Sequence, residues 1–577
     1  MTRLKLKIAA FAAGTSVTLA AAVGATTPAL APAPASGTAR VVDIVPGIDW
    51  SLPAHVKLSP YSGYMTWGWK WAHKQAKLPR YQDGNIHFCG FTGLRWGEVN
   101  PAEGVYDWTR IDKVVEEITS VPGVGFGFYV QCAAKIHHRQ KVPVVPEWLA
   151  KKGTVTFLSN TSVAPWDRGS EYQKYLGRMI EELGARYKDH PKLIGVYMGG
   201  LDYRAGEWCW RDAPESVKEA FETTTLTPET FGAWGLQFID DYVKAFKGQE
   251  HKLAWPGGYD HITFGRAFRP AKRKLWQTAY AKGCGGRDGM VEAWNGYLND
   301  GHGMRLTDAG YLEVIEDFAP IREGRIWYTE NENYPRAFTS TNGWGVGFGP
   351  STYAPMRWFV SNMRALQMRR NWLLIGSRAT FPLLARDPEF TRWVELSIGK
   401  NATTSADAWS WLREGYRKQK PGTIKNFERW LLQRDVEPDG KTVTAAKVDL
   451  SWWGKHASWY VGKDHEFHAR RTDLANGSRY IYFRADREFL KRGPHRLLVK
   501  VTYRDGAPTE WRLEYAGAAG KARSEPITTQ DTGEWQTVTL SVPDMQFSGT
   551  FADKMDFRLA VSGDRDLTVK MVRVVKP

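Results

Sequence analysis

The sequence has few of the residues and motifs that mark several large classes of protein. Only four cysteines occur among 577 residues, and none of them form a CxxC pair, so no structural zinc site is indicated. The adjacent histidines His137 and His138 are not accompanied by an HExxH motif, and no GxSxG motif is present. No Gly-rich phosphate loop follows the first predicted strand. We therefore predict no metal and no cofactor.

Long apolar runs are also missing after the first 31 residues. Residues 1–31 contain a basic start, an Ala-rich apolar stretch and a small-residue cleavage pattern at Ala29 to Ala31, which predict a signal peptide. The alternative is a membrane anchor, but the apolar core is short and is interrupted by Gly and Ser. We expect a secreted or periplasmic protein whose residues 32–50 form a leader.

The chain is rich in basic residues and in tryptophan. Residues 1–31 contain three basic residues and no acidic one, so their removal changes the formal charge from +16 to +13. Such a charge is compatible with an anionic polymer as the partner, or with solubility alone, and nucleic acid is not expected in a secreted protein. Several of the 27 tryptophans lie in polar, Gly-rich stretches such as "YMTWGWKWAH", which suit the apolar faces of sugar rings.

Residues 51–435 alternate short apolar runs with amphipathic helical segments. Eight such strand-and-helix pairs predict an α/β fold of the (β/α)8 TIM barrel type, and an open doubly wound sheet is the alternative. The predicted strands begin near residues 63, 88, 123, 192, 252, 289, 325 and 371. Helices are expected at 108–120, 170–187, 231–246, 308–321 and 356–369.

Residues 436–577 have a different pattern. They contain short alternating runs such as "RYIYFRADREF" and "HRLLVKVTYRDG", separated by turn residues, which predict a smaller antiparallel β-sandwich. We expect this domain to be carbohydrate-binding or accessory.

Carboxylates follow several of the predicted barrel strands. Active sites of such barrels lie at the carboxyl ends of the strands. Asp202 and Glu207 follow strand four, Glu292 lies within strand six, and Glu330 and Glu332 follow strand seven. Two carboxyl groups that face each other across the barrel mouth are what glycoside hydrolysis requires.

Three stretches of the chain resemble clan A glycoside hydrolases of the β-galactosidase and agarase-like type. "LRWGEVNPAEGVYDWTRID" (94–112) resembles their strand-two segment, and "ARYKDHPKLIGVYMGGLDYRAGEW" (185–208) resembles their passage into strand four. "SADAWSWLRE" (405–414) resembles a closing helix of secreted members, and the C-terminal sandwich resembles their appended domain. The resemblance implies a barrel that cleaves glycosidic bonds, with galactans as the favoured substrates.

The resemblance also implies roles for individual residues. Strand four of the clan usually ends in Asn-Glu with the Glu as the general acid/base, whereas this chain has a longer turn ending in Gly-Glu-Trp, so we assign that role to Glu207. Asp202 is the rival, but we favour a role for it as a turn residue or as a supporting residue of the substrate site. Strand seven carries the nucleophile, which points to Glu330, and Arg95 matches an arginine that orients it. The alternative for Arg95 is a structural ion pair.

Strand geometry separates Glu330 from Glu332. Glu330 shares the face of Tyr328, and Glu332 shares it only if the strand continues through "NENYP", which is unlike a strand. Glu332 is then expected either to contact substrate or to support a residue that does. Six further candidates for sugar contact lie near strand ends, with barrel packing as the alternative: Trp96, Trp208, Trp294, Asn295, Tyr328 and Trp372. Glu292 could hydrogen-bond a sugar hydroxyl, or pair with a buried arginine.

These observations predict a secreted, retaining glycoside hydrolase that cleaves a polysaccharide or its oligosaccharides, including anionic or sulfated galactans. Two alternatives remain open from the sequence. One is a barrel that binds carbohydrate without catalysis, because the strand-four ending departs from the family pattern. The other is a polysaccharide lyase, which needs a Tyr or His base and an acidic sugar.

Overall fold

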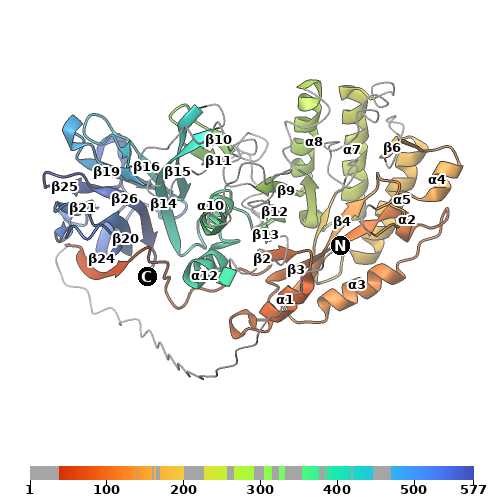
Figure 1. Ribbon diagram of the computed structural model, residues 1–577, viewed down its shortest axis with the longest axis horizontal. Coiled ribbons are helices and arrows are strands. Elements are labelled where there is room, and N and C mark those ends of the chain that lie inside the picture. Colours follow the sequence, from red (N-terminus) through yellow and green to blue (C-terminus); the bar gives the residue numbers. More distant parts are fainter. Residues whose placement is uncertain are drawn as a thin grey trace, which may run out of the picture. The chain divides into compact units, whose positions relative to one another are not determined.

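The computed structural model describes most of the chain after the predicted signal peptide (Figure 1). The described residues are 38–137, 140–158, 161–163, 169–199, 226–256, 266–290, 304–314, 324–331, 354–375, 384–385, 387–417, 420–445 and 469–577. The predicted signal peptide at 1–31 lies outside them.

Eight parallel strands close into a barrel in the order β12-β13-β2-β3-β4-β7-β8-β9. This arrangement confirms the predicted fold class, and each barrel strand overlaps the run that predicted it. The strands are β2 (Gly63–Thr66), β3 (Phe88–Arg95), β4 (Val124–Gln131), β7 (Leu193–Tyr197), β8 (Leu253–Pro256), β9 (Gly285–Met290), β12 (Trp327–Asn331) and β13 (Trp372–Leu374).

The barrel strands are nearly continuous apolar runs because both of their faces are buried. All eight residues of β4 are buried, as are seven of the eight residues of β3. One face packs against the surrounding helices, and the other fills the interior of the barrel.

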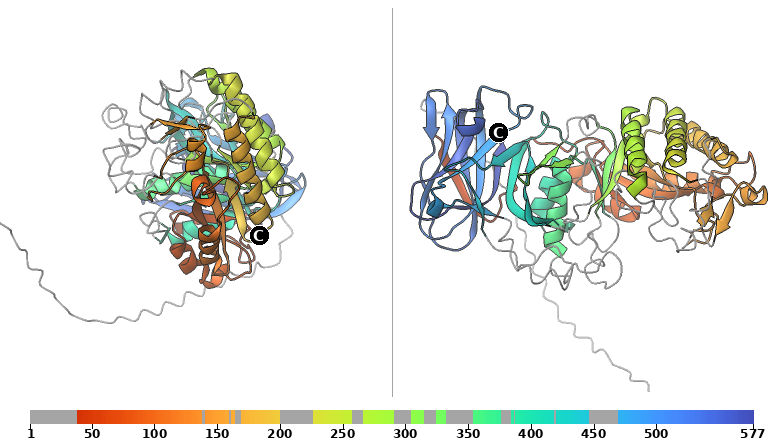
Figure 2. Two further views of the ribbon diagram at one scale, coloured as in Figure 1. Left: turned by 90° about the vertical axis from the view of Figure 1, so that its right-hand side faces the viewer. Right: turned by 90° about the horizontal axis from the view of Figure 1, so that it is seen from above.

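Helices cover the outside of the barrel, and α5, α7 and α8 pack side by side in chain order (Figures 1 and 2). The predicted cap of α5 is present, because Ser170 Oγ accepts a hydrogen bond from the backbone N–H of Gln173 at 3.3 Å. The helices of this region are α1 (Trp69–Ala76), α2 (Trp96–Val99), α3 (Thr109–Thr119), α4 (Glu147–Lys151), α5 (Glu171–Tyr187), α7 (Pro228–Ala245), α8 (Arg269–Ala281), α10 (Ala354–Gln367) and α12 (Pro388–Ser397). Among the described residues, no helix has the length and apolar character needed to cross a bilayer.

Two helix predictions are wrong where the structure describes them. The stretch predicted as a helix at 308–321 begins with an antiparallel hairpin of β10 (Met304–Leu306) and β11 (Leu312–Val314). The segment 405–414, for which the resemblance implied a closing helix, lies largely in β14 (Asp407–Arg417). Both faces of β14 are buried in its first half, so its residues show no period of two that would have marked a strand.

Two antiparallel sheets pack around a second apolar core, which confirms the β-sandwich. One sheet runs β1-β24-β20-β26-β14-β15 with β17 and β18 at its side, and the other runs β16-β19-β25-β21-β22 with β23 at its side. The strands are β1 (Arg40–Pro46), β14 (Asp407–Arg417), β15 (Lys420–Arg429), β16 (Leu431–Arg434), β17 (Val443–Thr444), β18 (Arg470–Arg471), β19 (Tyr480–Ala485), β20 (Pro494–Arg504), β21 (Glu510–Gly517), β22 (Gly520–Arg523), β23 (Ile527–Thr528), β24 (Trp535–Gln546), β25 (Phe557–Val561) and β26 (Thr568–Val575).

The antiparallel pairing starts before residue 436. β14, β15 and β16 belong to these sheets, and so does β1, which lies within the predicted leader and pairs with β24. The division of the chain at 436 remains a prediction about domains, while the sheets themselves combine strands from both sides of it.

Candidate active site

The inward-facing residues of the barrel follow from strand alternation. Phe91, Tyr129 and Tyr328 belong to a buried cluster that is distinct from the core between strands and helices. We call it the lumen cluster: Met65, Ile86, Cys89, Phe91, Tyr129, Ile194, Tyr197, Ala254, Ile326, Tyr328, Trp372 and Leu374. Residues two positions further along the same strands face the same way, and this register defines the mouth of the barrel.

Aromatic rings fill the lumen below the mouth. The rings of Tyr129 and Tyr197 stack at 4.8 Å with an interplanar angle of 3°, and Phe91 lies 5.7 Å from Tyr328. The guanidinium of Arg287 lies 5.7 Å from the centre of the Tyr197 ring, and this residue is only 4% exposed. The lumen is therefore a packed core, and a ligand approaches it from the end.

Arg95 is the last residue of β3 and has the inward register of Cys89 and Phe91. Its Nη1 donates a hydrogen bond to Glu98 Oε2 at 2.9 Å, and Arg110 Nη2 donates to the same oxygen at 2.7 Å. Burial lowers the pKa of Arg95, and the ion pair with Glu98 opposes that shift. The ion-pair reading of Arg95 is thus present in the structure, although this pair leaves part of the guanidinium uncommitted.

The uncommitted part of Arg95 folds back over Gly93. A Cβ placed on Gly93 would lie 3.3 Å from Arg95 Nη2 and 3.4 Å from Gln131 Oε1. Gln131 is the last residue of β4, the strand next to β3. A guanidinium and a carboxamide therefore lie together above a residue that has no side chain, and both can hydrogen-bond to a hydroxyl or an anionic oxygen.

Glu330 lies in β12, the seventh strand of the barrel in chain order. Its Cα pairs with Leu374 in β13 and with Gly289 in β9, and it follows Tyr328 by two positions. The structure describes the backbone of Glu330 and not its side chain. The strand-seven position predicted for the nucleophile is therefore present, while its contacts stay a prediction.

Most of the other predicted site residues lie outside the described residues. The catalytic role of Glu207 and its rivalry with Asp202 stay predictions for that reason. Glu292 was expected inside strand six, and this stays a prediction because the described residues include that strand only as β9 (Gly285–Met290). The complete set outside the described residues is Asp202, Glu207, Trp208, Glu292, Trp294, Asn295 and Glu332.

Two predicted sugar contacts are placed away from the mouth. Trp96 is fully buried, its ring lies 5.3 Å from that of Tyr172 in α5, and its Nε1 donates to Asn100 Oδ1 at 3.1 Å. Trp372 is the first residue of β13 and, with Tyr61, lines a cavity of about 450 Å³ at the amino end of the barrel strands. The geometry favours packing for both tryptophans.

Sequence reasoning missed three residues that the structure places in or at the end of the lumen. Trp67 follows β2 two positions after Met65, so the alternation that located Glu330 could also have found it. The same alternation predicts that Gln131, the last residue of β4, faces the lumen. Arg287 was missed because strand six was predicted four residues too late in the chain, on a more apolar run.

The described residues contain no group of three or more His, Cys, Asp or Glu side chains arranged to hold a metal ion. Cys89, Cys132 and Cys284 are buried free thiols, and burial raises the pKa of Cys132 and of Cys284 to about 12. Such thiols are poor nucleophiles and poor metal ligands at neutral pH.

Comparison with known proteins gives one curated relative and several solved structures. No family model matches the chain. Over 222 residues the chain is 25% identical to a β-galactosidase from Arthrobacter sp., and the match covers 37% of this chain and 29% of that enzyme's length. This similarity agrees with the resemblance to β-galactosidase-like barrels found in the sequence.

The solved structures have lower identity. The catalytic domain of a β-amylase from Paenibacillus polymyxa is 12% identical with a TM-score of 0.34, over 59% of this chain and 99% of that one. An exo-β-1,4-mannosidase from Opitutaceae bacterium strain TAV5 is 12% identical with a TM-score of 0.29, over 60% and 53%. Endo-glycoceramidase II from Rhodococcus sp. is 10% identical with a TM-score of 0.29, over 91% and 100%.

Proposed function

We propose that the protein is a glycoside hydrolase that cleaves a polysaccharide or its oligosaccharides with retention of anomeric configuration. The observation that carries this proposal is the position of Glu330 in the seventh strand of a closed parallel barrel, next to the end of the strand. The similarity to a β-galactosidase supports the same class of reaction.

In the proposed reaction Glu330 attacks the anomeric carbon while the glycosidic bond breaks, and Glu207 gives its proton to the departing oxygen. A water molecule then attacks the same carbon, Glu207 takes up a proton from that water, and the ester bond to Glu330 breaks. Two inversions leave the configuration unchanged. Arg95 supports the first step as a positive charge near the mouth, which favours an ionised carboxylate.

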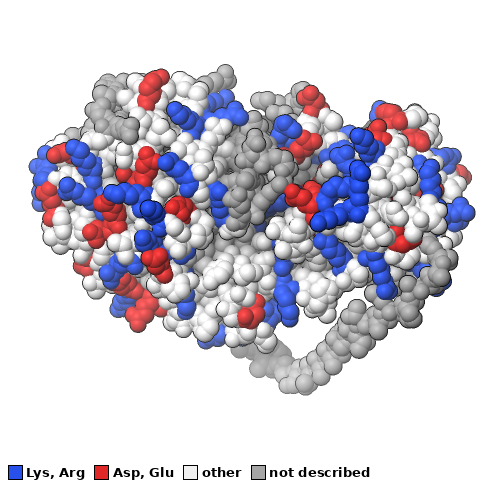
Figure 3. Space-filling view, turned by 180° about the vertical axis from the view of Figure 1, so that it is seen from behind, with Lys and Arg blue, Asp and Glu red and all other residues white. Residues whose placement is uncertain are grey.

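For the substrate we propose a galactan, with sulfated or other anionic polymers as the first to be tested. The excess of basic residues supports this choice. Lys and Arg side chains are spread over much of the face seen in Figure 3, with Asp and Glu side chains between them. Such a surface attracts a polyanion weakly at many points. Recognition of the individual sugar units would then take place at the mouth of the barrel. We also propose that the protein is exported, as its first 31 residues suggest.

The test starts from a panel of neutral and anionic polysaccharides, with the anomeric configuration of the first product followed by NMR. The cleaved sugar is then offered as its activated 2-deoxy-2-fluoro glycoside, which traps a glycosyl-enzyme, and the labelled peptide is sequenced by mass spectrometry. We expect the label on Glu330 and a loss of at least 10³-fold in kcat for Glu330→Gln, because the covalent step is removed.

Four results would contradict the proposal in different ways. A label on Glu332 would move the nucleophile by two residues, and an inverted first product would replace the covalent mechanism by direct attack of water. Products that absorb in the ultraviolet would indicate a lyase, and binding without turnover would indicate a non-catalytic barrel.

A further inference from the structure

Trp67 is an exposed aromatic residue at the carboxyl end of the first barrel strand. It directly follows β2 and has the inward register of Met65, which belongs to the lumen cluster. It is 39% exposed, whereas Met65 is fully buried. Trp67 therefore lies where the packed lumen meets the solvent.

Two residues of the lumen cluster fix the orientation of this ring. The Trp67 ring lies 4.9 Å from that of Phe91 at 64° and 5.4 Å from that of Tyr129 at 80°. These edge-to-face contacts come from the two neighbouring strands β3 and β4 and hold the indole without covering it. A rigid, partly exposed indole loses little conformational entropy when a ligand stacks on it.

The same two strands carry polar groups at inward-facing positions beyond Phe91 and Tyr129. Arg95 Nη2 and Gln131 Oε1 converge over Gly93, and Arg95 is 96% buried. Arg95 Nε donates no hydrogen bond within the part of the chain that the structure describes. A pyranose ring has one face of C–H groups and an edge of hydroxyls. The exposed indole of Trp67 suits the C–H face, and the guanidinium and carboxamide at the ends of the neighbouring strands suit the hydroxyls.

We propose that Trp67 is the stacking platform of a sugar-binding subsite at the end of strands β2, β3 and β4, with Arg95 and Gln131 as its polar edge. This inference rests on the proposed function and adds to it the side of the mouth at which a sugar unit is held. The subsite lies on other strands than β12, which carries Glu330: β13 separates β12 from β2, two strands separate it from β3, and three separate it from β4 in either direction.

The chain offers a matched control at the other end of the barrel. Tyr61 is 57% exposed, precedes β2, and lines the cavity at the amino end of the strands. Its φ is 50°, a conformation that Asn tolerates well, so Tyr61→Asn removes an exposed aromatic ring with little backbone strain.

The experiment compares wild type, Trp67→Ala, Trp67→Phe and Tyr61→Asn on the same panel of neutral and anionic oligosaccharides. Binding is measured on this panel, kcat and KM on each cleaved compound, and the melting temperature on each variant. For Trp67→Ala we expect about a tenfold loss of affinity with kcat changed less than threefold, because one buried ring face corresponds to about that factor. Trp67→Phe should recover part of the loss, and Tyr61→Asn should match wild type.

The outcomes separate this inference from the proposed function. If wild type cleaves or binds a glycan and Trp67→Ala has the same affinity and KM, the subsite is refuted while the glycosidase proposal stands. If Trp67→Phe falls as far as Trp67→Ala, or if Tyr61→Asn falls with them, stacking at Trp67 is refuted. If wild type neither binds nor cleaves any glycan on the panel, both proposals fail together.

Discussion

The lumen of the barrel and the interior of the sandwich are packed with different kinds of side chain. The sandwich interior is dominated by aliphatic strand residues such as Val499, Leu540 and Val572. The lumen contains tyrosines, and it is bordered by Arg95 and Arg287, which are each only 4% exposed. Burying such groups costs free energy unless they are paired. The sandwich interior is therefore held mainly by aliphatic packing, whereas the lumen is packed by aromatic rings and has buried arginines at its border.

The sandwich sheets also contain buried charged side chains, and one cluster of them is closely paired. Asp407 in β14 accepts hydrogen bonds from Arg573 Nε at 2.9 Å, from Arg573 Nη2 at 2.8 Å and from Trp393 Nε1 at 2.9 Å. Both charged side chains are 2% exposed. Trp393 belongs to α12, so this cluster joins the sheet to a helix that follows the last barrel strand.

Breaking this cluster gives the largest expected change. Asp407→Ala leaves Arg573 charged and buried without its carboxylate, so the free energy of unfolding should fall by about 3–5 kcal/mol. The measurement is urea denaturation at pH 7. Because Asp407 lies outside the proposed site, the folded fraction should keep the kcat of wild type.

An exposed ion pair serves as the control for this prediction. Lys244 and Glu181 are 75% and 48% exposed, and Glu181→Ala should leave the unfolding curve of wild type unchanged. Equal curves for Asp407→Ala and wild type would mean that the buried cluster contributes nothing to stability. A loss of kcat in Asp407→Ala would contradict the separation of roles.

The second prediction concerns the two arginines that pair with Glu98 at the end of β3 in the barrel. Arg95 and Arg110 pair with the same carboxylate, but the side chain of Arg95 is 5% exposed and that of Arg110 is 41% exposed. Arg95→Lys replaces a planar fork by a point charge, so kcat/KM should fall by about 10- to 100-fold. Arg110→Met removes the outer partner and should leave kcat/KM within about threefold of wild type.

The two arginine variants distinguish a role at the mouth from a role in folding. Their melting temperatures and kcat/KM are measured side by side. Equal losses of kcat/KM in both variants would mean that Glu98 only needs positive charge, and that Arg95 is a structural ion-pair residue.

The fold was predictable from the sequence where burial produces a simple pattern. Strands such as β3 and β4 are buried on both faces and therefore appear as continuous apolar runs. β9 was displaced because "GGRDGM" is polar and Gly-rich, and the more apolar run after it attracted the prediction. The segment at β14 was expected to be a helix only because it resembles a closing helix of secreted clan members, and no pattern of its own residues supported that expectation.

The candidate site was predictable only through strand register. Alternation placed Arg95 at the mouth, and the same rule applied to β2 would have given Trp67. The sequence could not tell which end of a short strand a residue occupies, so Trp372 was expected at the mouth and lies at the opposite end. It also could not show that the Arg95 side chain divides its donors between Glu98 and the region above Gly93.

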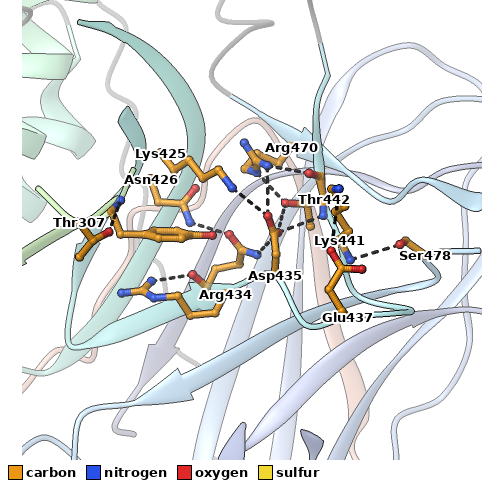
Figure 4. A network of polar contacts seen from close by, with 12 residues as sticks. Thr307, Lys425, Asn426, Arg434, Asp435, Glu437, Lys441, Thr442, Arg470 and Ser478 are labelled. Atoms are coloured by element: carbon orange, nitrogen blue, oxygen red, sulfur yellow. Dashed lines mark hydrogen bonds and ion pairs between the residues drawn. The ribbon is translucent and has the colours of Figure 1, made fainter. Parts of the chain in front are cut away.

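The third prediction concerns an acidic network in the sandwich sheets and has the smallest expected effect. Asp435 accepts hydrogen bonds from the backbone N–H of Thr442 at 3.0 Å, from Thr442 Oγ1 at 2.6 Å and from Lys425 Nζ at 2.9 Å, and Arg470 lies 3.8 Å away (Figure 4). Burial alone would raise the pKa of Asp435, but Arg470, Thr442 and Lys425 together outweigh burial and hold that pKa below its usual value.

A lowered pKa in the folded state means that Asp435 stabilises the protein above the pKa of an unfolded carboxyl group, about 3.9. This contribution is lost as the pH falls through the lower pKa of the folded state. Asp435→Asn should therefore cost about 1–2 kcal/mol at pH 7, and the difference from wild type should shrink below about pH 4. Urea unfolding from pH 7 to pH 3 measures it, with Asp308→Asn on the exposed turn before β11 as the control that should follow wild type throughout. The free energies of unfolding of Asp435→Asn and wild type could instead differ by the same amount down to pH 3. Asp435 would then contribute through its shape and hydrogen bonds, and its charge would add nothing to the stability of the sandwich.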